Sequence, residues 1–387
     1  MYKNIRYLLD IVKYALGGEK CEVPADTDWK EIVKIANTQG LIGMVTHVIG
    51  EIDAPDMVKE FLEAHRMKMV FKETNQEVLV AGILEDFEKE GIKAMPMKGY
   101  ILKNLYPESE MREMVDVDIL IDQSQYEEIK PIMEQNGFTF DKESAHEYIF
   151  IRLPAVAVEL HKSIVPNYNT ELYDYYGDGW KFAKKKPGYE NIYELSKEDF
   201  YIYTLVHAAK HYIGSGIGMR HVVDMWVLKE AYMPEMDNEY LDAELEKLGL
   251  TKFNKMMCDL ADVWFGSGEM YDELKYMEEF ILGGGVLGTK ERADASEIYR
   301  NSVEKNYTEV KRESIKTLIF PKLSVLKEKY KILEKLPFLY PFAIVWRGIA
   351  AIFAKKVTKE IGKRTVGSKE LDDFAMHCEI AGLRKTL

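Results

Sequence analysis

The sequence contains little cysteine: three of its 387 residues, Cys21, Cys258 and Cys378. They are odd in number and far apart, and no two of them form a CxxC pair. Neither a disulfide framework nor a cysteine-bound metal is therefore indicated, and we expect a reducing compartment, the cytoplasm.

Positive charge is also in deficit. Lys and Arg number 52 against 65 Asp and Glu, which gives a formal net charge of −13. Bulk binding of nucleic acid over the whole surface is therefore not expected, although a local basic site is still compatible with this balance.

Long uninterrupted apolar runs are missing as well. Charged residues interrupt the helical apolar pattern of residues 2–18, so we expect no signal peptide there. The most apolar segment, 338–354, is short for a membrane span and contains Pro341 and Arg347. We expect it to be amphipathic or buried, in a terminal helix that docks on the core. Peripheral contact with an anionic membrane is the alternative, because basic residues follow: Lys355, Lys356, Lys359, Lys363 and Arg364.

The apolar spacing divides the chain into three regions. Residues 1–90 have helical periodicity, residues 91–195 alternate short apolar runs with helical patterns, and residues 196–387 are helical again. The length suffices for two or three domains. We therefore expect an α+β fold in which an α/β segment is flanked by N-terminal and C-terminal helical regions.

Two helices of the first region have recognisable ends. Asp28 is an expected N-cap, with Glu31 three residues later, and Gly40 is an expected left-handed residue after the last turn. A second, long helix is predicted over residues 56–89, with a mostly charged outer face.

A tight turn follows the first expected strand, residues 92–97. Lys98 and Gly99 form this turn, and a helix begins at once, so its first N–H groups would face an anion beyond the strand. Gly99 would let a phosphate approach the backbone and Lys98 would add charge, although glycine often occupies such turns for conformational reasons alone.

Two acids begin the next expected strand. Asp116 and Asp118 are two residues apart, so in a strand they would point to the same face, about 6.5 Å apart. Their hard oxygen ligands suit Mg²⁺ or Mn²⁺, whereas the alternative is a pair of solvated acids. The opposite face would enter the core with the alternate apolar residues Val115, Val117, Ile119 and Ile121.

A third acid lies inside another apolar run. Ala155, Ala157 and Glu159 would share one face of a strand, and a carboxylate there is costly unless it is paired or metal-bound. His161 shares that face. It could hold Glu159, contact a phosphate or bind an acceptor, or be a partly buried histidine without a role.

The C-terminal helical region repeats an i, i+4 spacing. His207 and His211 form one such pair, and Arg220 and Asp224 form another on the next helix, so two helices could line one pocket. A zinc site is not indicated, because no glutamate stands in the position that an HExxH motif requires. Two interpretations remain: these residues contact a nucleotide or an acceptor, or they form a network that packs the helices together.

In this order and spacing, the residues resemble the uncharacterised nucleotidyltransferases of the DNA polymerase beta-like superfamily. The resemblance extends from about Asp56 onward. It rests on Lys98-Gly99, Leu105-Tyr106-Pro107, Arg112, Asp116-Val117-Asp118 and Glu159-Leu160-His161, and continues through His207, His211, Arg220, Asp224 and KLPFLYPFAIVWR. The superfamily usually has Gly-Ser or Gly-Gly in the turn. Here, as in this branch, Lys-Gly replaces it, so the hydroxyl that would touch a phosphate is missing.

The resemblance implies a small mixed nucleotidyltransferase-type sheet and phosphate-centred chemistry. Two Mg²⁺ or Mn²⁺ ions would clamp a nucleoside triphosphate while a hydroxyl of a protein, sugar or small-molecule acceptor attacks and pyrophosphate leaves. Asp116 and Asp118 would hold both ions, and Glu159 would complete the site and act as base. Nucleotide or phosphate contacts would come from Lys98, Gly99, Arg112, His161, His207, His211, Arg220 and Asp224. An arginine in a loop, such as Arg112, is, however, more often a surface residue.

Two other functions remain open. A sugar-nucleotide glycosyltransferase also uses a DxD pair, but usually at the end of a strand in a larger fold than residues 91–163 allow. A catalytically silent nucleotide-binding or scaffold protein could retain the same fold, although three unused carboxylates would cost stability without their ions.

Overall fold

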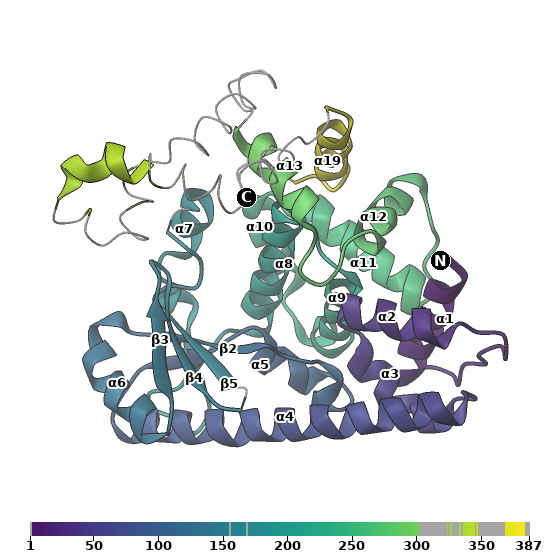
Figure 1. The fold of residues 1–387 in the computed structure, drawn as a ribbon, viewed down its shortest axis with the longest axis horizontal. Coiled ribbons are helices and arrows are strands. Elements are labelled where there is room, and N and C mark those ends of the chain that lie inside the picture. The colour runs from purple at the N-terminus through teal and green to yellow at the C-terminus, as the bar shows by residue number, and fades with distance from the viewer. Residues whose placement is uncertain are drawn as a thin grey trace.

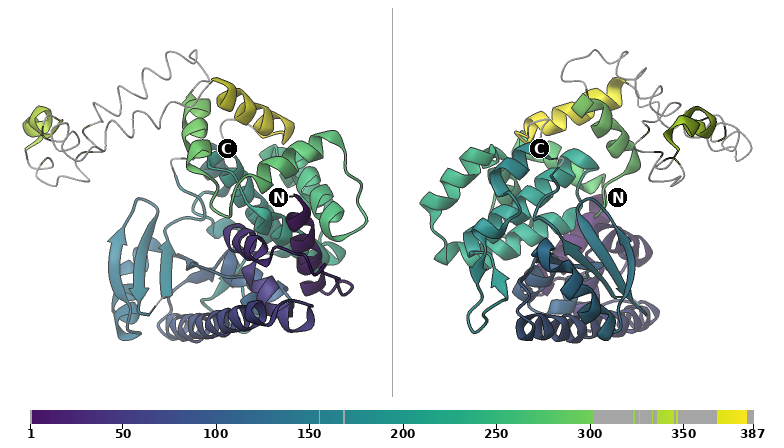
Figure 2. Two further views of the ribbon diagram at one scale, coloured as in Figure 1. Left: turned by 45° about the vertical axis from the view of Figure 1, so that its right-hand side comes forward. Right: turned by 90° about the vertical axis from the view of Figure 1, so that its left-hand side faces the viewer.

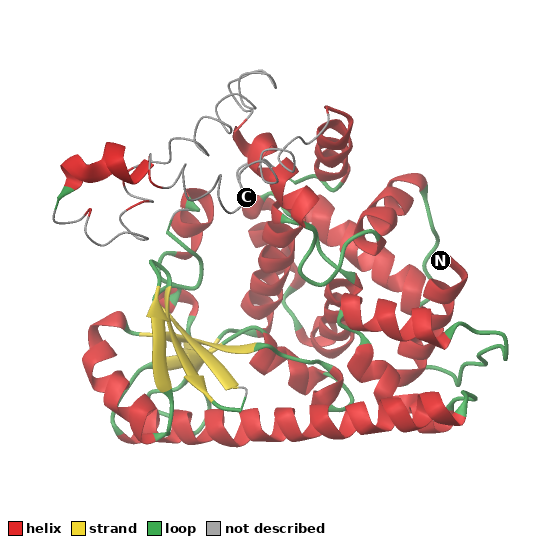
Figure 3. Cartoon of the chain, viewed as in Figure 1, coloured by secondary structure: helices red, strands yellow, loops and turns green. Residues whose placement is uncertain are grey.

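The computed structural model describes residues 2–154, 156–167, 169–301, 323, 326, 333, 336–344, 346 and 368–383. In these parts the protein is predominantly helical, and its main sheet, of five strands, lies at one end of the molecule (Figure 3). The fold class is α+β, as the sequence predicts.

The N-terminal region consists of four α-helices and one 3₁₀ turn: α1 (Tyr2–Ala15), α2 (Trp29–Gln39), α3 (Ile42–Val48), η1 (Ile49–Glu51) and α4 (Asp56–Lys89). The Asp28 carboxylate accepts a hydrogen bond from the Glu31 N–H at 3.1 Å, and Gly40 has a left-handed φ of 70°. Both predicted ends of α2 are therefore confirmed. The bounds of α4 are also those predicted, and it runs along the base of the molecule beneath the sheet and the N-terminal helices (Figure 1).

The sheet is mixed and has five strands in the order β1-β2-β5-β4-β3. Its central strands β2 and β5 are parallel, and the other neighbours are antiparallel. The strands are β1 (Ala94–Pro96), β2 (Asp116–Ile121), β3 (Thr139–Glu143), β4 (Glu147–Arg152) and β5 (Val156–His161). A separate two-stranded sheet pairs β6 (Lys184–Lys185) with β7 (Tyr193–Glu194).

One face of the sheet is covered by α4 and α6 (Tyr126–Gln135). Val117, Ile119 and Ile121 of β2 are buried there with alternate residues of β5, as predicted. Val115 was expected on the same face, but this prediction is wrong, because β2 begins only at Asp116 and the Val115 side chain is 72% exposed. The acids of β2 and β5 therefore point to the other face of the sheet.

Short elements connect the strands to the second helical region. They are α5 (Gly99–Leu102), η2 (Lys103–Leu105), η3 (Ser109–Met111), η4 (Gln123–Gln125), α7 (Thr170–Tyr176) and η5 (Trp180–Phe182). The second helical region contains α8 (Lys197–Gly214), α9 (Met219–Tyr232), η6 (Met233–Glu235), α10 (Asn238–Leu248), α11 (Thr251–Phe265), α12 (Asp272–Leu282), α13 (Lys290–Asn301), η7 (Pro337–Leu339) and α19 (Ser368–Ile380).

One large apolar core joins the two helical regions. It contains Leu8 of α1 and Met44 of α3 together with Tyr201 of α8, Met257 of α11 and Met277 of α12. The N-terminal helices thus pack directly against helices that follow them by more than a hundred residues (Figure 2). The division into residues 1–90, 91–195 and 196–387 stays a prediction about folding units.

Within the described ranges, every helix is too short or too polar to cross a bilayer. Phe338, Phe342 and Trp346 have exposed side chains, so the described part of the apolar segment does not bury these rings. Ala155, Arg347 and the basic residues from Lys355 to Arg364 lie outside the described residues.

The cap of α2 gives a test of the fold. Replacing Asp28 with Ala removes the acceptor for the Glu31 N–H, and we expect a loss of about 1 kcal/mol in the free energy of unfolding. Urea denaturation followed by circular dichroism measures this loss. The neighbouring exposed Lys30→Ala is the control, and equal stabilities of the two variants would show that the cap contributes nothing.

Candidate active site

The carboxylates meet at the parallel pair of strands. Asp118 of β2 lies directly opposite Glu159 of β5, and Asp116 lies opposite Ala157. Ligand atoms of Asp118, Glu159 and His161 all lie within 4.8 Å of one another. Burial raises the pKa of Asp116, and the negative charges of Asp118 and Glu159 raise it further. The structure thus brings the three acids into one cluster on the face opposite α4 and α6.

Lys98 reaches this cluster from the turn after β1. Its Nζ lies 2.5 Å from Oδ1 of Asp118, so the two form an ion pair. Burial alone would raise the pKa of Asp118, but Lys98 and His161 outweigh burial and hold this pKa well below its ordinary value. Lys98 has a φ of 46°, a conformation that costs a non-glycine residue about 1–3 kcal/mol and that is typical of functional sites.

Gly99 is required by close packing. A Cβ at this position would lie 2.7 Å from a guanidinium nitrogen of Arg112 and 2.9 Å from the sulfur of Met114. The helix that follows, α5, has only four residues, so its dipole adds little to an anion site. The positive charge of the turn therefore comes from the side chain of Lys98.

His161 is buried beside the acids. Its Nε2 lies 2.6 Å from Oδ1 of Asp118 and 3.6 Å from Glu159. Burial would lower the pKa of His161, yet its hydrogen bonds to the two carboxylates outweigh burial and raise it. Its Nδ1 lies 3.1 Å from Nε2 of His146, just before β4. No sequence pattern indicates His146, because a single histidine in a polar loop forms no motif.

Arg112 and Asp224 form a buried ion pair next to the turn at Gly99, close enough to Asp118 for the charges of Arg112 and Asp118 to interact. Arg112 donates from Nε to Oδ1 of Asp224 at 2.8 Å and from a terminal nitrogen to Oδ2 at 3.0 Å, and the Tyr106 hydroxyl donates to Oδ1 at 2.6 Å. Arg220 donates to the backbone oxygen of Glu113 at 3.3 Å. Arg112 is buried and ties the segment before β2 to α9, so it is not a surface residue, and its predicted contact with a triphosphate stays a prediction.

The two histidines of α8 lie near α9, because the rings of His211 and His221 are 6.3 Å apart and the charge of Arg220 acts on His211. The rings of His207 and His211 are 4.4 Å apart. Burial lowers the pKa of His207 well below its ordinary value and that of His211 to about 4. Among the described residues, neither His207 nor His211 belongs to a group whose ligand atoms lie close enough together to share a metal. The pair therefore lacks the geometry of a zinc site.

A small cavity of about 20 Å³ adjoins the acids, where residues from the Lys98 turn and from α8 meet. It is lined by Lys98, His146, Ile164, Val165, Tyr203, Val206, His207 and Lys210. Of the four helical residues predicted to share a pocket, only His207 lines it.

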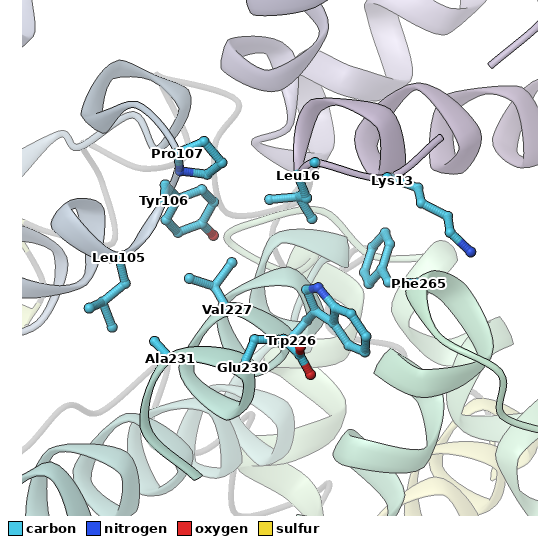
Figure 4. Close-up of a pocket in the computed structure, with 12 residues that line it drawn as sticks. Lys13, Leu16, Leu105, Tyr106, Pro107, Trp226, Val227, Glu230, Ala231 and Phe265 are labelled. Carbon is cyan, nitrogen blue, oxygen red and sulfur yellow. The ribbon is translucent and has the colours of Figure 1, made fainter. Parts of the chain in front are cut away.

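A larger cavity of about 490 Å³ lies between α1, α9 and the loop around Pro107 (Figure 4). Trp226 and Phe265 form part of its wall, and Lys13 and Glu230 are its charged residues. None of the three acids lines it. Tyr106 does, and its hydroxyl bonds to Asp224, so this cavity adjoins the Arg112–Asp224 pair and not the acidic cluster.

A small mixed sheet with acids on two adjacent parallel strands defines a nucleotidyltransferase-type protein. The chain belongs to the family described as uncharacterised nucleotidyltransferase, whose model matches residues 25–266. This range contains the whole sheet, the Lys98 turn and helices α8 and α9. No curated protein and no solved structure matches the chain.

Removing only one partner of the Arg112–Asp224 pair should destabilise the protein more than removing both. Arg112→Met leaves the buried Asp224 carboxylate without its cation, and we expect a loss of about 3–5 kcal/mol in the free energy of unfolding. The double variant Arg112→Met/Asp224→Leu removes both charges and should recover part of that loss. Chemical denaturation of the two variants measures the difference. A single variant as stable as the wild type would contradict a structural role for the pair.

Proposed function

We propose that the protein is a metal-dependent nucleotidyltransferase. It transfers a nucleoside monophosphate from a nucleoside triphosphate to a hydroxyl acceptor and releases pyrophosphate. The observation that carries this proposal is the pairing of Asp118 with Glu159 on adjacent parallel strands, with Asp116 on the same face. Membership of the nucleotidyltransferase family supports a triphosphate as substrate.

The residues of the cluster fit divalent cations. Their carboxylate oxygens are hard ligands of the kind that Mg²⁺ and Mn²⁺ prefer. Lys98 and His161 offset the charge of Asp118, whereas the raised pKa of Asp116 reflects burial and negative neighbours. Asp116, Asp118 and Glu159 would hold two ions. When bound, such ions neutralise phosphate charge and lower the pKa of a coordinated hydroxyl.

Glu159, Lys98 and His161 would each have a different role in this reaction. Glu159 takes the proton of the acceptor hydroxyl, whose oxygen forms a bond to the α-phosphorus while the bond from that phosphorus to the bridging oxygen breaks. Pyrophosphate leaves with the electron pair of that bond. Lys98 exchanges its ion pair with Asp118 for one with a phosphate, and His161 keeps the Asp118 carboxylate oriented.

Two features of the site weigh against a glycosyltransferase. The DxD pair opens β2 instead of ending a strand, and the main sheet has only five strands. We infer a cytoplasmic location as well, which the three free cysteines support. The acceptor class and peripheral contact of the basic C-terminal segment with a membrane stay predictions.

The carboxylates give the direct test of the proposed reaction. Asp116→Asn and Asp118→Asn should each reduce transfer to background, because both remove charge that holds the ions. Mass spectrometry and a pyrophosphate assay, with each triphosphate and Mg²⁺, measure the products.

The matched control is Asp122→Asn, just after the same strand, which should keep wild-type activity. Full activity of both site variants would contradict the proposal. Release of a nucleoside diphosphate from a sugar nucleotide would point to the glycosyltransferase. Tight triphosphate binding without turnover across many acceptors would point to the silent binding protein.

A further inference from the structure

A second lysine faces the small cavity beside the acids. Lys210, on α8, lines this cavity together with Lys98 from the turn after β1. Neither the spacing of the sequence motifs nor the family resemblance singled it out. The two lysines line the same space from different elements, Lys98 from the turn after β1 and Lys210 from α8.

Among the described residues, no carboxylate lies within ion-pair distance of Lys210, although the charges of Asp118 and Glu147 act on it from farther away. Lys98, by contrast, pairs with Asp118 at 2.5 Å. Lys210 is only partly exposed, and burial together with the charge of Lys98 lowers its pKa to about 8. A half-buried ammonium group without a close anion is costly, and an incoming anion would offset that cost.

The remaining polar groups of the cavity suit an anion as well. Burial lowers the pKa of His146 to about 3 and that of His207 well below its ordinary value, so both rings are neutral near pH 7. Both ring nitrogens of His146 already have partners, His161 and Ser163, so the N–H available to an anion is that of His207. The positive charges at the cavity are therefore the two lysines.

We propose that Lys210, together with Lys98, binds the terminal phosphates of the nucleoside triphosphate and the pyrophosphate that leaves. This inference rests on the proposed function and adds the residue from α8 that recognises the leaving group. Lysine is a common phosphate ligand because its ammonium group is a compact charge with three donors.

The size of the cavity sets a condition on binding. About 20 Å³ does not admit a diphosphate, so lining side chains have to move before the phosphates enter, and Lys98 would then exchange Asp118 for a phosphate. That movement removes the positive charge of Lys98 from Asp118, whose Oδ1 keeps its contact with His161, and leaves the charge of this carboxylate to a cation. Phosphate binding by the two lysines is thereby coupled to occupation of the acidic cluster.

Calorimetry on the full chain tests the role of Lys210. The probes are Mg²⁺ with inorganic pyrophosphate, with a non-hydrolysable triphosphate and with a nucleoside monophosphate. Lys210→Met should weaken pyrophosphate and triphosphate binding at least about tenfold, which corresponds to about 1.4 kcal/mol, and leave monophosphate binding unchanged. Lys210→Arg should retain most of the affinity, because it keeps the charge.

Two controls separate a phosphate contact from a structural role. Lys130→Met removes an exposed lysine of α6 and should bind all three probes like the wild type. Lys210→Gln repeats the loss of charge with a different side chain, in case the methionine variant folds poorly. A uniform loss for all three probes would indicate a structural role and overturn the inference.

The outcomes also distinguish this inference from the proposed function. If the wild type binds Mn²⁺ and the triphosphate, and the Lys210→Met and Lys210→Gln variants bind pyrophosphate as tightly, the inference alone is wrong. If the wild type binds neither Mn²⁺ nor any triphosphate, both are wrong. Selective loss of pyrophosphate affinity, with Mn²⁺ binding to the acidic cluster intact, supports both.

Discussion

Repulsion between neighbouring carboxylates is the constraint on which the organisation of this protein depends. The parallel pairing of β2 with β5 sets Asp118 beside Glu159, and Asp116 lies on the same face. Such a cluster is costly without positive charge nearby. Lys98 supplies part of that charge from a backbone conformation that is itself unfavourable, and His161 supplies hydrogen bonds to two of the acids. The fold thus holds ligand atoms of Asp118, Glu159 and His161 close enough together that they could hold a cation.

The helical regions fix the position of this site. The Arg112–Asp224 pair attaches the segment before β2 to α9, and one apolar core joins the N-terminal helices to α8, α11 and α12. Because α8 is held in this way, its residues His207 and Lys210 face the Lys98 turn across a small cavity. The sheet supplies the acids, and the helical region supplies part of the surroundings in which a substrate would bind.

Short-range sequence patterns predicted the elements whose ends depend on neighbouring residues. The cap at Asp28, the left-handed residue Gly40 and the long helix α4 follow from short-range spacing, and the fold class follows from the alternation of patterns. Contacts between distant segments do not produce a short-range sequence pattern. Arg112 and Asp224 are 112 positions apart in the sequence, and His146, just before β4, contacts His161 at the end of the neighbouring strand β5. Neither contact could be predicted from spacing.

The proposed function depends on the binding of divalent cations by the acidic cluster. Titration of the protein with Mn²⁺, followed by electron paramagnetic resonance in the presence of a non-hydrolysable triphosphate, measures this binding directly. We expect saturable binding of two ions per chain. Mn²⁺ that stays free in solution at every protein concentration would contradict it.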